Sequence, residues 1–199
     1  MTKEYSCVKK TKQAFINSLA ELSKDIPLNK ITVKMLCEHA GLSRNAFYFH
    51  YKDINDLLED IEDSIVNAAT ANFDTFREIG FPKNIHATVV ALIELVDENR
   101  EVCRMLFDKS DSFTERMNKV FCDFNYQYYS DYHGDNKRTV YDFFYMFISS
   151  GFYGLLKYWL DNPDKLTKKE LIGLAFVLVK RLLVLGNPDI DYMPKKKSE

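Results

Sequence analysis

The chain has 199 residues, of which 46% are hydrophobic, and its formal net charge is −2. This apolar content excludes an intrinsically disordered chain, and the small numbers of glycine and proline, 7 and 5, favour long helices over a turn-rich β fold. Residues 1–52 contain nine Lys and Arg against four acidic residues, so this segment carries +5 and the remainder carries −7. A basic end on an acidic body is expected where one end of a protein contacts phosphates.

Residues 7–24 are predicted to form the first helix, which ends before Pro27 because proline restricts the residue that precedes it. Lys9, Lys10 and Lys12 lie near the start of this helix. Two interpretations stay open for these lysines, contact with a DNA backbone or a solvated charged face. The apolar residues fall on one helical face and would pack against the segment that follows: Val8, Phe15, Leu19, Leu22 and Ile26.

The segment from Ile31 to Lys52 is predicted to form two short helices around a tight turn. Thr32 and Ser43 are good N-caps, because a hydroxyl can accept a hydrogen bond from a free amide of the first helical turn. Gly41 can adopt the left-handed conformation that ends the first of the two helices. Two capped helices joined through a glycine predict a helix-turn-helix, whose second helix enters the DNA major groove.

The second of these helices carries side chains suited to DNA. Arg44, Asn45 and Tyr48 fall within about a quarter-turn of one another. Arg can form a bidentate pair of hydrogen bonds with guanine, and Asn can do so with adenine. Tyr48, His50 and Lys52 offer donors for phosphate oxygens. A solvated polar helix is the alternative interpretation, but the paired caps together with this run of residues favour DNA binding.

Further helices are predicted from apolar residues at helical spacing. Asp53 would cap the first of them, which would link the two halves of the protein, and Thr167 with Glu170 forms a capping box before the last. The acidic residues of the linking helix are expected to form a charged solvent face: Glu59, Asp60, Glu62 and Asp63. The predicted helices span residues 53–79, 82–99, 100–109, the aromatic-rich segment 111–132, 137–160 and 167–185.

The last two predicted helices, 137–160 and 167–185, are apolar over wide arcs and are expected to be buried on more than one side. In a chain of this size that pattern predicts a partner subunit. Small residues between Ser149 and Gly154 would let another helix approach closely.

Several other classes of protein are disfavoured. The N-terminus lacks the apolar core of a signal peptide, and residues 171–185 are too short and too interrupted by Lys180-Arg181 to span a bilayer, so a cytoplasmic protein without a membrane segment is expected. No phosphate loop, GxSxG, HExxH or metal-spaced Cys/His cluster occurs, so no enzyme, metal site or cofactor is expected. The four separated cysteines indicate scattered buried thiols, with a redox-sensing pair as the alternative: Cys7, Cys37, Cys103 and Cys122.

The segment from about Thr11 to Leu58, about a quarter of the chain, resembles the DNA-binding domain of the TetR family of bacterial regulators. Ala46 stands where that family usually has Thr, and Ile54 where it usually has Lys. Residues 148–160 bear a weaker resemblance to the C-terminal domain of some Gram-positive members. The main resemblance rests on Ile31-Thr32-Val33, Ala40-Gly41-Leu42-Ser43 and Phe47-Tyr48-Phe49-His50-Tyr51-Lys52, with Leu57 beyond them.

The resemblance implies an all-α fold of about nine helices, with a helix-turn-helix in an N-terminal three-helix bundle and a larger C-terminal bundle. It implies a DNA-binding domain at residues 7–66, a ligand-binding and dimerisation domain at residues 67–199, and a homodimer through residues 137–185. Thr32 would join the phosphate contacts, and Lys34 would face bases. The predicted DNA-binding residues are Thr32, Lys34, Ser43, Arg44, Asn45, Tyr48, His50 and Lys52.

Aromatic residues of the C-terminal part have two interpretations, an apolar ligand pocket or ordinary bundle core, and only the resemblance favours the pocket. The predicted function is a dimeric, cytoplasmic transcription regulator, most simply a repressor released from a double-stranded DNA operator by a small-molecule effector. The alternative is a regulator or co-activator without its own ligand that acts through a protein partner. The candidate pocket residues are Phe73, Phe76, Phe107, Phe121, Phe124, Tyr128, Tyr145 and Phe152.

Overall fold

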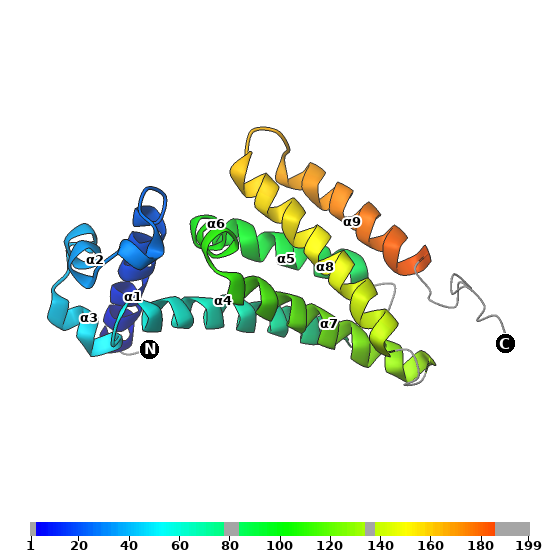
Figure 1. Cartoon of the computed structure of the whole chain (residues 1–199), viewed down its shortest axis with the longest axis horizontal. Helices are drawn as coiled ribbons and strands as arrows, with labels where there is room; N and C mark the ends of the chain where they lie inside the picture. The colour runs from blue at the N-terminus through cyan, green and yellow to red at the C-terminus, as the bar shows by residue number, and fades with distance from the viewer. Residues whose placement is uncertain (1–2, 78–83, 134–137, 186–199) are drawn as a thin grey trace, which may run out of the picture. The chain divides into compact units, whose positions relative to one another are not determined.

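The computed structural model describes residues 3–77, 84–133 and 138–185. Over these ranges the chain is all-α, as predicted, with nine α-helices, one short 3-10 helix and no strand (Figure 1). No helix in the described ranges is long and apolar enough to cross a membrane. The elements are α1 (Lys3–Leu22), η1 (Leu28–Lys30), α2 (Val33–Ala40), α3 (Arg44–His50), α4 (Ile54–Arg77), α5 (Asn84–Glu98), α6 (Arg100–Lys109), α7 (Asp111–His133), α8 (Arg138–Asp161) and α9 (Lys168–Leu185).

The helix boundaries depart from the predicted ones by a few residues. α1 begins at Lys3, four residues before the predicted start, and ends at Leu22, so Ile26 lies outside it. α4 begins directly after its predicted N-cap, because the Asp56 amide donates a 3.0 Å hydrogen bond to Asp53 Oδ1. The capping signals therefore locate helix starts more closely than the apolar pattern does.

The described helices group into two compact units that interleave along the chain. The first unit combines residues 3–69 with 95–116, and the second combines the described residues between 70 and 94 with those from 117 to 185. α4 is one continuous helix that contributes to both units. The predicted functional division into residues 7–66 and 67–199 stays a prediction.

The core of the first unit lies where α1 packs against α2 and α3. Phe15, Leu19, Leu36, Phe47 and Leu57 are fully buried there. The Phe15 and Phe47 rings meet edge to face with their centroids 5.3 Å apart. Because burying one such side chain contributes about 1.5–3 kcal/mol, these contacts hold the helix-turn-helix on α1 and the start of α4.

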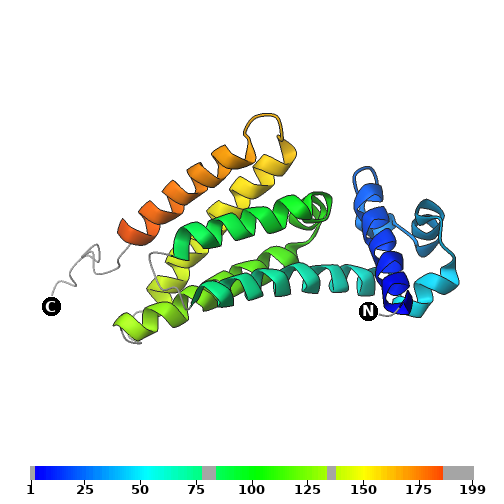
Figure 2. The same ribbon diagram turned by 180° about the vertical axis from the view of Figure 1, so that it is seen from behind.

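In the second unit, α8 and α9 lie side by side and run in opposite directions (Figures 1 and 2). The connection between them is fixed at both ends. The Trp159 indole Nε1 donates a 2.9 Å hydrogen bond to the Leu166 carbonyl. The predicted capping box is present, with the Thr167 amide donating to Glu170 Oε2 at 2.9 Å and the Glu170 amide donating to Thr167 Oγ1 at 3.3 Å.

The prediction that the acidic residues of α4 form one solvated face is wrong for Glu62, which is only 5% exposed. Its carboxylate accepts hydrogen bonds from Ser110 at 2.6 Å, Ser112 at 3.1 Å and the Arg116 guanidinium at 3.2 Å. These partners lie 48 to 54 positions later in the chain. A buried carboxylate is acceptable here because charged and polar donors surround it.

Candidate nucleic-acid interface

Two capped helices, α2 and α3, meet at Gly41, as the sequence predicts. The Met35 amide donates a 3.2 Å hydrogen bond to Thr32 Oγ1, and the Ala46 amide donates a 3.1 Å hydrogen bond to Ser43 Oγ. Gly41 has φ +65°, in the left-handed region where glycine has no Cβ to clash. The chain therefore forms a helix-turn-helix, with both helix starts and the turn specified by local sequence.

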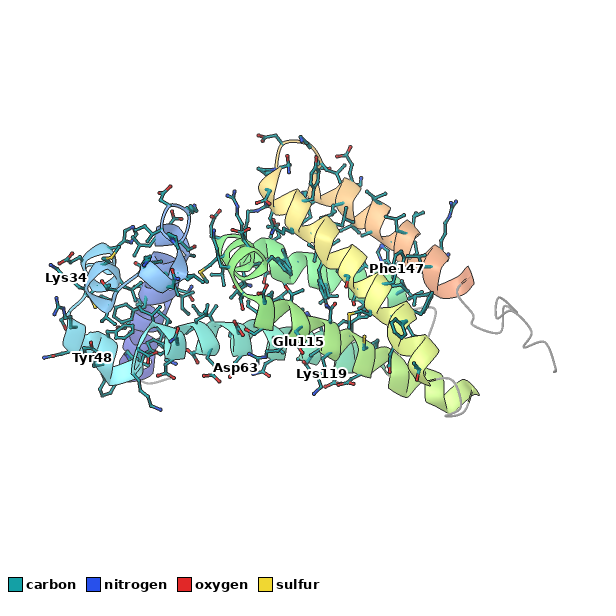
Figure 3. All side chains as sticks on the ribbon, in the orientation of Figure 1. Lys34, Tyr48, Asp63, Glu115, Lys119 and Phe147 are labelled. Atoms are coloured by element: carbon teal, nitrogen blue, oxygen red, sulfur yellow. The ribbon has the colours of Figure 1, made fainter. Side chains whose placement is uncertain are left out.

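α3 has one buried face and one exposed face. Phe47 is fully buried, whereas Arg44, Asn45, Tyr48 and Phe49 are exposed, the last two at 58% and 78% (Figure 3 labels Tyr48). At about 100° per residue, these four side chains occupy a continuous arc of about 140° on the helix. The geometry fits a helix that packs on its own unit with one side and can enter a groove with the other.

A polar cluster ties the end of α3 to α1 and α4. Asp60 Oδ2 accepts a 3.0 Å hydrogen bond from Lys12 Nζ and a 2.8 Å hydrogen bond from the Tyr51 hydroxyl. The Lys12 ammonium also lies 5.0 Å from the centroid of the Tyr51 ring. Burial disfavours the charged carboxylate, but the hydrogen bonds from Lys12 and Tyr51 outweigh burial and lower the pKa of Asp60. In the structure, Lys12 is thus engaged in fixing the orientation of α3.

His50, at the end of α3, is half-buried. Its ring meets the Phe49 ring edge to face, with the centroids 4.9 Å apart. Burial and the positive charge of Lys12 both lower the pKa of His50 below its usual value of 6.5. The imidazole is therefore neutral at pH 7, with one N–H available to donate to a phosphate oxygen.

The eight predicted DNA-binding residues lie on one stretch, from the N-cap of α2 to the residue before the N-cap of α4. All are exposed except the half-buried His50. Lys34 Nζ lies 3.9 Å from Glu38 Oε1 in an exposed ion pair on α2. The Lys52 amide donates a 2.8 Å hydrogen bond to Asp56 Oδ2. Their contacts with DNA stay a prediction. The residues are Thr32, Lys34, Ser43, Arg44, Asn45, Tyr48, His50 and Lys52.

Sequence reasoning missed two features of this unit. The first is that Phe49 is exposed among the polar residues of α3. Its position four residues after Asn45 could have indicated this exposure, because that spacing places both side chains on one helix face. The cluster of Lys12, Tyr51 and Asp60 gave no short-range signal, because its members come from three separate segments.

Four of the aromatic residues predicted for a ligand pocket form one buried cluster in the second unit. Phe73 lies with its ring centroid 4.7 Å from that of Phe124 and 6.0 Å from that of Phe121. Phe121 in turn lies 6.2 Å from Tyr145. Phe152 is also buried, beside Tyr153. This arrangement is compatible with bundle core and with a pocket wall, so the pocket stays a prediction.

Of the other three candidates, the structure describes the side chain of one. Phe107 belongs to the first unit, where its ring centroid lies 5.3 Å from that of Phe113. The side chains of Phe76 and Tyr128 lie outside the described residues.

The described cysteines are free, with Cys37 and Cys103 buried and Cys122 half-buried. Burial raises the pKa of all three thiols, that of Cys103 to about 12. Because the thiolate is the reactive form, these environments favour inert thiols over redox sensors. The side chain of Cys7 lies outside the described residues. Among the described side chains, no group of three His, Cys, Asp or Glu could hold a metal ion.

Comparison with known proteins gives one family match and a set of similar folds. A family model described as the C-terminal region of a transcriptional regulator matches residues 83–181. No curated protein sequence matches the chain.

Among solved structures, a TetR-family regulator from Syntrophomonas wolfei is similar at a TM-score of 0.67, with 12% identity over 88% of this chain and 96% of that one. NalD, the secondary repressor of the MexAB-OprM multidrug efflux pump in Pseudomonas aeruginosa, has a TM-score of 0.61 with 14% identity, over 87% of this chain and 96% of its own. The dihydroxyacetone kinase operon activator DhaS has a TM-score of 0.53 with 14% identity, over 88% and 95%. These likenesses concern the fold.

Proposed function

The chain belongs to the TetR family of transcriptional regulators, and from this premise we propose a dimeric, cytoplasmic repressor that a small ligand releases from its DNA operator. The observation that carries the proposal is the exposed arc of α3 beside two capped helix starts. Both a repressor and an activator are among the proteins of similar fold, so the sign of regulation is part of the proposal.

In the proposed complex, α3 lies in the major groove. Arg44 and Asn45 contact base edges, because their planar donor groups match guanine and adenine. Tyr48, His50 and Lys52 donate to phosphates on either side and set the register of the helix. The basic charge of residues 1–52 supplies the sequence-independent attraction.

The proposed dimer forms through α8 and α9. Exposed apolar residues on α8 include Phe143 and Phe147, at 76% and 68% exposed, and the exposed Gly151 and Gly154 have no other residue near the position of a Cβ. An exposed apolar surface of this kind marks an interface, and the glycines would let a second helix approach closely. Among the described side chains of these helices, the other large apolar residues that are exposed are Met146, Tyr158, Leu174, Val177, Leu178 and Leu182.

The proposed effector binds in the second unit, at the aromatic cluster around Phe73 and Phe121. α4 supplies Phe73 to that cluster and Asp60 to the cluster that holds α3, so a displacement of this continuous helix would act at both ends. A ligand changes DNA affinity only if it binds the DNA-competent and incompetent states differently. By reciprocity, operator DNA must weaken the ligand by the same factor, a coupling of about 1–3 kcal/mol.

The test begins with selection of duplex DNA from a random library by the purified protein. We expect an enriched two-fold symmetric motif, and its absence would overturn the proposal. Arg44→Ala and Asn45→Ala should each relax one position of the motif at a cost of about 1–3 kcal/mol. Lys52→Ala should weaken binding to every sequence alike and reduce the salt dependence by about one unit for each phosphate that the lysine neutralises.

The effector is tested separately, by screening small molecules for release of the selected DNA. Titration of a releasing compound with and without the operator should give different affinities. Equal affinities would remove the ligand from the mechanism and leave a regulator that acts through a protein partner.

A further inference from the structure

Phe49 has the largest exposed fraction, 78%, among the large apolar side chains that are exposed in the described part of the chain. It stands on the polar face of α3, four residues after Asn45, so the two side chains are neighbours on the helix surface. One edge-to-face contact, with the His50 ring at 4.9 Å, limits where the Phe49 ring can lie. In the free protein this ring is exposed to water, so an apolar partner that covered it would gain the free energy of burying its surface.

The chemistry of the DNA groove supplies one such partner. Phenylalanine has no hydrogen-bond donor, so it cannot hold a phosphate oxygen or a base edge as Arg44 and Asn45 can. The largest apolar group that the major groove presents is the 5-methyl group of thymine, and an aromatic side chain can pack on it.

We propose that Phe49 packs on a thymine methyl in each half-site and so selects a T·A pair beside the base that Asn45 reads. The inference rests on the proposed function, because it requires α3 to lie in the major groove. It deepens that function, because it assigns a specificity-determining role to an apolar residue and names the chemical group recognised.

The expected size follows from burial of one methyl group, which corresponds to about a fourfold change in affinity. A symmetric operator with two half-sites should therefore bind about fifteenfold more weakly when both methyl groups are removed, if the two contributions add. Such changes are within reach of fluorescence anisotropy with labelled duplexes.

The experiment replaces each thymine of the selected operator in turn by deoxyuridine, which removes the methyl group and keeps the base pair. The affinity of the full-length protein should fall about fourfold per half-site at one thymine position and little elsewhere. Phe49→Ala should bind the thymine operator more weakly and should no longer distinguish it from the deoxyuridine operator at that position. Phe49→Leu, which keeps an apolar side chain, should retain part of the discrimination.

Tyr48→Phe is the matched control, because it alters the adjacent exposed ring and removes only a phosphate donor. It should weaken binding while the thymine-to-deoxyuridine ratio stays that of the unmodified protein. Circular dichroism melting of each variant establishes that the helix-turn-helix is folded.

Three results would overturn the inference. One is an operator in which no thymine methyl matters. A second is a methyl effect that persists undiminished in Phe49→Ala. The third is a Phe49→Ala variant that binds all DNA sequences more weakly by the same factor, which would place the ring against the sugar–phosphate backbone. If no DNA motif is enriched at all, the proposed function itself fails, and this outcome is distinguishable from the other three.

Discussion

The hydroxyl of Ser110 donates a 2.6 Å hydrogen bond to the carboxylate of Glu62, although the two residues are 48 positions apart. Ser110 Oγ also accepts a 3.2 Å hydrogen bond from the Phe113 amide and thus caps α7. One hydroxyl therefore donates to the buried Glu62 carboxylate on α4 and caps the N-terminus of α7. The pair links α4 to the α6–α7 corner inside the first unit.

Ser110→Ala should destabilise the first unit by about 2 kcal/mol, since it removes an N-cap and a hydrogen bond to a charged group. Ser112→Ala is the matched control, because this exposed hydroxyl also donates to Glu62 but its removal leaves Ser110 and Arg116 in place. The control should cost about 0.5 kcal/mol. Urea unfolding measures the free energy of unfolding of the two variants. Equal destabilisation would contradict the double role of Ser110 as an N-cap and as a hydrogen-bond donor to Glu62.

Gly41→Ala should destabilise the helix-turn-helix by about 1–2 kcal/mol, because the left-handed conformation at φ +65° disfavours a Cβ. No other residue comes within 4 Å of the position of that Cβ, so the cost comes from the backbone alone and not from a clash with a neighbour. Gly41→Asn should cost less, since Asn adopts this conformation more readily. Thermal unfolding compares the two variants, and an alanine variant as stable as the parent would contradict this explanation.

DNA affinity should rise as the pH falls from 7 towards the lowered pKa of His50. The lowered pKa keeps free His50 neutral at pH 7, and a phosphate beside it would favour the protonated form, so binding takes up a proton in this range. The gain is at most about tenfold per pH unit for each His50 involved. Anisotropy titrations at constant ionic strength measure it.

The matched controls for this pH dependence are two histidine variants of the same unit. His50→Gln should flatten the profile, whereas His39→Gln, on the exposed surface of α2, should retain it. A profile unchanged by His50→Gln would exclude this residue as the titrating group.

Phe147→Glu should convert the proposed dimer to a monomer, because it places an unpaired charge in the apolar face of α8 at a cost of about 2–5 kcal/mol. Phe49→Glu is matched in residue type and exposure but lies on α3, so it should leave the oligomeric state unchanged. Light scattering at micromolar concentration measures the molar mass of both variants in solution. A Phe147→Glu variant that remains dimeric would place the interface elsewhere.

Local sequence was sufficient for the helix-turn-helix and for the helical class of the chain. Caps such as Thr32 and Ser43 act through bonds to amides three residues away, and the left-handed Gly41 needs no distant contact. The periodic apolar residues of each helix are likewise visible at short range. These interactions span only a few residues, so the order of amino acids along the chain reveals them.

Tertiary structure alone decided which charged residues are solvated and which belong to the fold. Glu62 and Asp60 occupy one acidic run of α4, yet Glu62 meets Ser110 and Asp60 meets Lys12 and Tyr51. Helical spacing places Phe49 on the same face as Asn45, but only packing decided which face of this short helix is exposed. Burial and pairing depend on segments distant in the chain that packing brings together, and no local pattern encodes that distance.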